Sequence, residues 1–328
     1  MSRERLSELD RAKGLAILLV VIGHVVARQP PAGNEWYEIG KYLIYYFHMP
    51  FFMFLSGFII EYTYKPLVGF SQFSSYVKSK FLRLMPAFLI MAILIYLGKL
   101  IASHFIQVDN LQGRDVSALL DILLYPAQSS ASSLWYIYVL FLFYLIFPVI
   151  HWLIQRKVIW MVVGLCAFIV QDELTHLFML NRVAEFLLFI MVGAWVARNY
   201  ETFSNHNYRY GWLWALIFVI ALVASEYLLL PKLILGLLSI PALMFFVSAQ
   251  YVKDSAILTQ LGKYVFVIYL LNTIVIGLVK GVGLKFVSWD GINFIPYFIV
   301  LMLAGLYVPI LIKQFLFSKS PLLDKYTT

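Results

Sequence analysis

The chain has 328 residues, of which 62% are hydrophobic and only 13% are charged. This small number of polar residues cannot cover the surface of a soluble globule of this size. The composition therefore excludes a soluble protein and predicts an integral membrane protein. The net charge of +8 is better explained by membrane topology than by a nucleic-acid-binding surface, so we expect no nucleic-acid partner.

Apolar stretches long enough to cross about 30 Å of hydrocarbon recur along the chain. They predict an all-α, polytopic membrane protein with a single domain over residues 1–328 and ten transmembrane helices. The fifth stretch is short and only Pro231 separates the seventh from the eighth, so nine or eleven helices are the alternatives. The ten stretches are residues 11–29, 37–62, 81–103, 134–155, 157–171, 183–199, 211–229, 231–250, 264–284 and 293–316.

Basic residues indicate the topology. With ten spans and a cytoplasmic N-terminus, seventeen of the 25 Lys and Arg residues fall inside and eight outside. This excess predicts that both termini are cytoplasmic. A cleaved signal peptide is the competing interpretation, because Val25, Val26 and Ala27 form a small-residue pattern after an apolar core. The mixed charges before that core and the nine later stretches argue against cleavage.

The first stretch, LDRAKGLAILLVVIGH, contains three ionisable residues on nearly one helical face. Lys13 and His24 are eleven residues apart, which leaves an offset of only about 20°, and Asp10 lies about 40° away on the other side. The face therefore runs from an acid and a base at the inner boundary to an imidazole about 16 Å deeper. Anchoring of Asp10 and Lys13 at the membrane interface is the simpler alternative.

The second stretch contains FHMPFFMFLSGF, in which His48 stands among apolar residues. Counted from the outer side, His48 lies about 16 Å deep, close to the depth of His24, so the two rings can meet. Pro50 lacks an amide and clashes with the carbonyl of Tyr46, which predicts a kink and a free acceptor beside His48. Intramembrane ionisable groups usually mark a functional site, although each ring could instead be a structural tie between helices.

These two segments carry a resemblance. DRAKGLAILLVVIGH followed by FHMPFFMFLSGF resembles the paired signature of the acyltransferase 3 family of multi-span membrane acyltransferases, most of all its fucose 4-O-acetylase-like and polysaccharide O-acetyltransferase branch. KSKFLRLMP and SSLWYIYVLFLFYLIFP resemble further family segments more loosely. One departure is VIYLLNT, where Asn272 stands in place of a histidine that relatives often have, and an amide cannot take a proton at neutral pH.

The resemblance implies transfer of an acyl group, usually acetyl, from acyl-CoA to a hydroxyl of a glycan or lipid-linked saccharide. The expected location is a bacterial inner membrane, with membrane lipids around the protein. His24 or His48 would be the catalytic base, and the other ring would orient it or carry the acyl group. We expect acyl-CoA as a substrate, with no bound cofactor and no metal.

The donor and acceptor are expected at opposite ends of the molecule. Lys13, Lys80 and Arg83 are candidates to bind the phosphates of CoA, or else they are ordinary basic residues of the inner side. Lys78 is interpreted only as such an inner-side residue.

Asp10, Trp135 and Asn272 are the candidates for binding the acceptor substrate. Trp135 could be a platform for a sugar ring or part of an interfacial aromatic belt. Glu185 and Glu226, near the outer ends of their spans, are weaker candidates for binding sugar hydroxyls. The alternative function is a secondary transporter or exporter that relays protons through a histidine pair, although no repeated half is evident.

Overall fold

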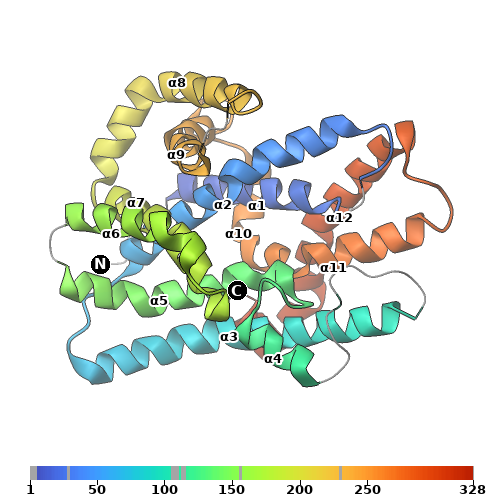
Figure 1. The fold of residues 1–328 in the computed structure, drawn as a ribbon, viewed down its shortest axis with the longest axis horizontal. Coiled ribbons are helices and arrows are strands. Elements are labelled where there is room, and N and C mark those ends of the chain that lie inside the picture. The colour runs from blue at the N-terminus through green and yellow to red at the C-terminus, as the bar shows by residue number, and fades with distance from the viewer. Residues whose placement is uncertain are drawn as a thin grey trace. The chain divides into compact units, whose positions relative to one another are not determined.

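The computed structural model describes residues 6–27, 30–104, 111, 116–154, 157–228 and 231–327. The described residues form an all-α fold of thirteen α-helices with short 3₁₀ turns between them (Figure 1). The basic residues Arg3, Arg5, Arg28, Arg114 and Arg156, which enter the topology prediction, lie outside the described residues.

The helices follow the apolar pattern of the sequence. Their bounds are α1 Ser7–His24, α2 Glu35–Thr63, α3 Gly69–Ala102, α4 Val116–Leu124, α5 Trp135–Leu153, α6 Lys157–Val170, α7 Leu180–Arg198, α8 Tyr200–Ala224, α9 Lys232–Ser248, α10 Ala256–Lys263, α11 Val265–Gly283, α12 Phe294–Phe315 and α13 Pro321–Tyr326. Within the described ranges, seven helical segments are long and apolar enough to cross a membrane. The prediction of a polytopic membrane protein is therefore confirmed.

Two helices extend well beyond the apolar stretches that predicted them. The prediction began the third stretch at residue 81, but α3 begins at Gly69, and α8 begins at Tyr200 rather than at residue 211. A hydropathy window detects only the part of a helix that matches the hydrocarbon, so polar turns at a helix end escape it. Consequently Ser75, Lys78 and Ser79 lie on a helix surface.

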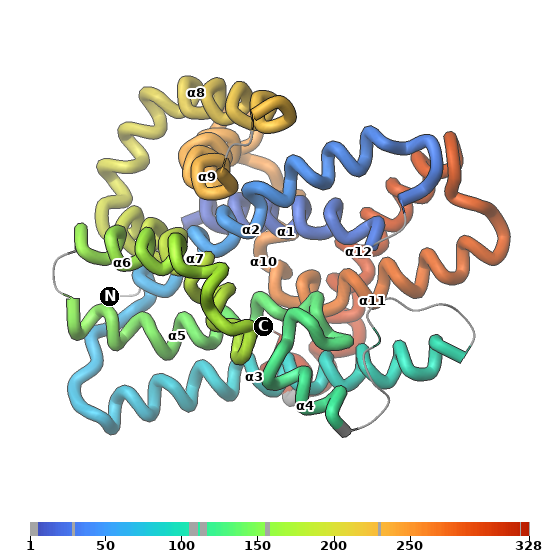
Figure 2. The backbone as a smooth tube through the Cα atoms, viewed as in Figure 1, coloured from blue at the N-terminus to red at the C-terminus, as the bar shows by residue number. Residues whose placement is uncertain are grey.

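The chain divides into two compact units. The first comprises residues 1–63 and 192–312, and in it α1 packs against α2, α9, α10 and α11, while α8 packs against α9. Figure 2 shows α8 and α9 of this unit as a backbone tube. The second unit comprises residues 64–191 and 313–328, in which α3 packs against α5 and α13 packs against α3.

The close packing of α1 on α10 depends on two glycines. A Cβ atom on Gly14 would overlap the backbone carbonyl of Leu258, and one on Gly262 would overlap that of Asp10. Only a residue without a side chain lets two helix backbones approach this closely. Helix α10 is too short to be recognised by hydropathy, yet it packs against the N-terminal part of α1.

Candidate active site

His24 is the last residue of α1, and its ring contacts Asn272 of α11. The Nδ1 atom of His24 lies 2.8 Å from the Oδ1 atom of Asn272, whose side chain is completely buried. The amide nitrogen of Asn272 donates to the backbone carbonyls of Ile268 at 2.8 Å and Tyr269 at 2.9 Å. These two acceptors fix the orientation of the amide, so its oxygen is the atom that faces His24.

The orientation of Asn272 decides the tautomer of His24. An amide oxygen can only accept a hydrogen bond, so Nδ1 of His24 is protonated and donates to it. In the neutral ring the Nε2 atom is then a free acceptor. Asn272 therefore gives His24 the protonation state of a general base without taking a proton itself.

His48 has the same tautomer for a different reason. Its Nδ1 atom lies 2.8 Å from the carbonyl oxygen of Ile44, one turn earlier on α2, so Nδ1 donates and Nε2 is again the acceptor. The sequence predicted that Pro50 leaves the carbonyl of Tyr46 as a free acceptor beside His48. The acceptor that Nδ1 of His48 contacts is the carbonyl of Ile44, and the freed carbonyl of Tyr46 stays a prediction.

The two histidines lie near each other, as their matched depth predicted. His48 is only 7% exposed. Tyr45 bridges them: its ring centroid lies 4.9 Å from that of His48, and its hydroxyl donates to the carbonyl of Gly23 at 3.0 Å. A Cβ atom on Gly23 would collide with the ring of Tyr45, which explains the glycine before His24.

A stripe of α2 holds the end of α1. Tyr37, Lys41 and Tyr45 are spaced four residues apart and donate to the carbonyls of Ile22 at 2.6 Å, Val26 at 2.7 Å and Gly23 at 3.0 Å, respectively. The last carbonyls of a helix have no partner within the helix, so these donors stabilise its C-terminus. We call this set the α2 stripe. Sequence reasoning missed it, because a spacing of four with two tyrosines is equally typical of an interfacial aromatic belt.

Asp10 and Lys13 lie at the opposite end of α1. Asp10 is buried and its carboxylate lies 2.7 Å from the ammonium of Lys13. At about 1.5 Å per residue, Lys13 is about 16 Å from His24 along the helix. The two residues therefore cannot touch a group that is reacting at His24, although they lie on the same helix.

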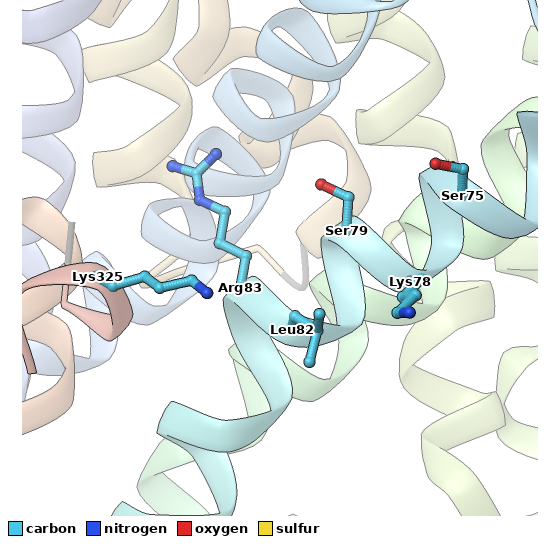
Figure 3. A pocket seen from close by; sticks show the side chains of 6 residues that line it. All are labelled: Ser75, Lys78, Ser79, Leu82, Arg83 and Lys325. Atoms are coloured by element: carbon cyan, nitrogen blue, oxygen red, sulfur yellow. The ribbon is translucent and has the colours of Figure 1, made fainter. Parts of the chain in front are cut away.

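Lys80 and Arg83, predicted to act together, face different surroundings in the second unit. The Nζ atom of Lys80 lies 4.4 Å from the ring centroid of Tyr144 and 5.3 Å from that of Tyr76, which are favourable cation–π contacts. Arg83 instead lines an open pocket of about 600 Å³ (Figure 3). The lining residues are Ser75, Lys78, Ser79, Leu82, Arg83 and Lys325. We call this the basic pocket.

Trp135, the candidate sugar platform, begins α5 in the second unit. Its ring stacks on that of Phe186 with centroids 5.5 Å apart, and the guanidinium of Arg182 lies 5.7 Å from its centroid. Glu185 is ion-paired to the same Arg182 at 2.5 Å. Part of the indole surface is therefore covered by its own unit, and Glu185 already has a cationic partner.

A comparison with protein-family models identifies the chain. The model of the acyltransferase domain of the acyltransferase 3 family matches residues 6–314. The chain belongs to this family. Comparison with curated proteins and with solved structures gave no match.

Membership of the family gives the reaction type. The protein is a membrane-bound acyltransferase, so it takes an acyl group from a donor and transfers it to an acceptor. The matched residues include His24, His48, Asn272 and Arg83 and end before α13. Lys325, which lines the basic pocket, therefore lies outside the region that defines the family.

Proposed function

We propose that this acyltransferase is an O-acetyltransferase of the fucose 4-O-acetylase-like and polysaccharide branch. It moves acetyl from acetyl-CoA to a hydroxyl of a cell-envelope or exported saccharide, in a bacterial inner membrane. The observation that carries the proposal is the pair of neighbouring imidazoles whose Nδ1 atoms are engaged by Asn272 and Ile44. Both rings can accept a hydrogen bond at Nε2, which suits the activation of an alcohol.

In the proposed reaction, Nε2 of His24 takes the proton of the acceptor hydroxyl. The hydroxyl oxygen attacks the thioester carbonyl, and the C–S bond breaks as the tetrahedral intermediate collapses to the ester. The leaving thiolate of CoA takes the proton from His24, so the base is regenerated. Nε2 of His48 accepts a hydrogen bond from a second hydroxyl of the saccharide and orients it. Transfer through an acyl-enzyme on one ring is the alternative route.

Donor and acceptor are proposed to approach this base from opposite sides. Arg83 binds a phosphate of CoA, and Lys80, its neighbour on α3, and Lys13 on α1 add positive charge on the donor side. Trp135 is proposed to contact the saccharide with the part of its ring that Phe186 leaves uncovered. Asp10 belongs with Lys13 on the donor side.

Asn272 was predicted to bind the acceptor, and we now propose a different role for it. Its amide nitrogen donates to two carbonyls and its oxygen accepts from His24. Its contribution to substrate binding is therefore indirect, through the orientation of the His24 ring.

We infer a single domain with ten spans and both termini in the cytoplasm. Helices α1, α6 and α9 are short or charged, and we propose that they also cross the membrane, which together with the seven long segments gives ten spans. Contacts between segments that are distant in the sequence support this topology, because the segments in contact are assigned to the same side of the membrane. On the proposed outer side, the Asp290 carboxylate accepts from the amide of Ala32 at 2.9 Å. On the proposed inner side, α1 contacts α10 and α13 contacts α3.

The proposal is tested with the purified protein in lipid nanodiscs, radiolabelled acetyl-CoA and a cell-envelope saccharide fraction. Replacing His24 by Ala should lower label transfer by about 10²- to 10⁴-fold, the usual contribution of a general base, and His48→Ala should lower it by at least about tenfold. His176→Ala is the matched control, because His176 is exposed. If either variant keeps near-normal turnover, its role is wrong. In a parallel assay with the same protein in sealed proteoliposomes, label that enters the vesicles without becoming bound to saccharide would indicate the transporter.

A further inference from the structure

The basic pocket combines two segments that are distant in the sequence. Ser75, Ser79 and Arg83 are spaced four residues apart on α3, so they share one face of that helix, and Lys78 lies beside them. Lys325 comes from α13 and extends toward Arg83 (Figure 3). Three cations and two hydroxyls therefore surround one open space, and no acidic side chain is among the described residues that line it.

Helix α13 is held in place by one buried lysine. Lys313, near the end of α12 and only 8% exposed, donates to the carbonyl of Asp324 at 3.0 Å, to its carboxylate at 2.9 Å and to the hydroxyl of Thr327 at 2.8 Å. These acceptors flank Lys325 in the sequence. Hydrogen bonds on both sides of Lys325 in the sequence therefore help to fix its position.

This arrangement suits a phosphate ester. Like-charged side chains repel one another, so a cluster without a carboxylate is favourable only when an anion neutralises it. Guanidinium, ammonium and hydroxyl groups are the donors that bind phosphate oxygens, and Arg83 can bind two oxygens at once. The same chemistry would fit the phosphates of CoA or the headgroup of an anionic phospholipid.

We infer that Lys325 of α13 completes the donor site by binding a phosphate group of acyl-CoA together with Arg83 and Lys78. This inference rests on the proposed function, in which acyl-CoA is the donor. It adds a binding residue from beyond the family-defining region, and it assigns to Lys78 a role that the sequence did not indicate. Leu82 would contact an apolar part of the bound molecule.

The test measures binding rather than turnover. CoA is titrated calorimetrically into the full chain in zwitterionic nanodiscs, and pantetheine, which lacks the phosphates, serves as the reference ligand. Lys325→Ala should weaken CoA binding about tenfold, since one charge-assisted contact is lost. It should leave pantetheine binding unchanged, and Lys325→Arg should restore the affinity for CoA.

Lys319→Ala is the matched control, because it removes the same charge six residues away and outside the basic pocket. Lys313→Met should weaken CoA binding as well, because α13 loses three hydrogen bonds that hold it.

CoA binding that is equal in the wild type and Lys325→Ala overturns the inference but leaves the donor assignment intact. Failure of the wild type to bind CoA overturns the proposed donor itself. Lys325-dependent binding of vesicles with anionic lipid, in place of CoA, would assign the pocket to a lipid phosphate and also overturn the inference.

Discussion

At the scale of single residues, Asn272 shows how an amide can orient a neighbouring histidine without exchanging a proton itself. The amide cannot exchange protons, but its two bonds to the carbonyls of Ile268 and Tyr269 hold its oxygen toward His24. A histidine at this position could be protonated on either ring nitrogen, so it would not fix the tautomer of His24 in the same way. In the proposed mechanism the acid–base role falls on His24, and Asn272 orients its ring.

Replacing Asn272 by Ala should therefore reduce kcat by about tenfold to 100-fold and change the KM for acetyl-CoA little. The His24 ring loses its orienting partner, whereas the donor contacts on α3 are untouched. Steady-state kinetics in nanodiscs, normalised to folded protein, measures the effect. Asn207→Ala is the control, since Asn207 is another buried amide in the same unit, with its nitrogen facing the carbonyl of Pro241. A rise in KM without a fall in kcat would contradict the orienting role.

The residues of the site differ in how visible they were in the sequence. His24 and His48 could be predicted because an imidazole inside an apolar stretch is conspicuous, and helix rise alone gives its depth. Tyr37, Lys41 and Tyr45 could not, because side chains that donate to backbone carbonyls leave no pattern distinct from an interfacial aromatic belt. Lys78 was set aside for the same reason, since a basic residue near the inner boundary is ordinary.

At the scale of helices, the contact of α1 with α10 positions the N-terminal half of α1. Gly14 and Gly262 meet backbone carbonyls at distances where no Cβ atom fits. Replacing either glycine by Ala should destabilise the protein by roughly 1–3 kcal/mol, the usual cost of overpacking. The thermal midpoint in detergent measures this loss.

Gly277→Ala is the matched control for these variants. Gly277 lies within α11, and no atom lies within 4 Å of the position its Cβ would occupy. Because Ala has a higher helix propensity than Gly, this variant should be neutral or slightly stabilising. An equal thermal midpoint for Gly14→Ala and Gly277→Ala would show that the close helix approach is not needed.

The helices themselves were largely predictable, and the reasons for the exceptions are physical. Long apolar windows located the membrane-crossing parts of α2, α5, α7, α11 and α12 to within a few residues. Helices α4, α10 and α13 were missed because fewer than ten residues cannot give a membrane-length signal. Contacts between distant segments, such as α13 with α3, have no signature in a single sequence.

At the scale of the whole molecule, the proposed topology makes a labelling prediction. In a Cys166→Ser background, cysteines at Ala32 and Lys285 should react with an impermeant maleimide added to intact cells. Cysteines at Lys253 and Lys319 should react only after permeabilisation, because their segments are assigned to the cytoplasmic side. Ala32, Lys285 and Lys253 are exposed, so burial would not explain a failure to react. Labelling of the Lys253→Cys variant in intact cells would contradict the proposed topology and indicate the opposite orientation.

The proposed outer loops are joined by Asp290. The hydroxyl of Ser288 and the amide of Ala32 donate to its carboxylate at 2.6 Å and 2.9 Å, which holds the pKa of Asp290 below its ordinary value. A group with a lowered folded-state pKa contributes its stability above the ordinary pKa and loses it as pH falls through the lowered one. The connection between these loops is therefore intact at neutral and mildly acidic pH.

The α2 stripe has a consequence for how the enzyme responds to its bilayer. Three side chains of α2, the helix that carries His48, donate to backbone carbonyls on both sides of His24, so the two imidazoles are held by one set of contacts. If a thinner or thicker bilayer tilts α1 and α2, these contacts should turn both imidazole rings together and keep the distance between them unchanged. Sensitivity to lipid length would then arise where donor and acceptor enter, and not at the reacting atoms.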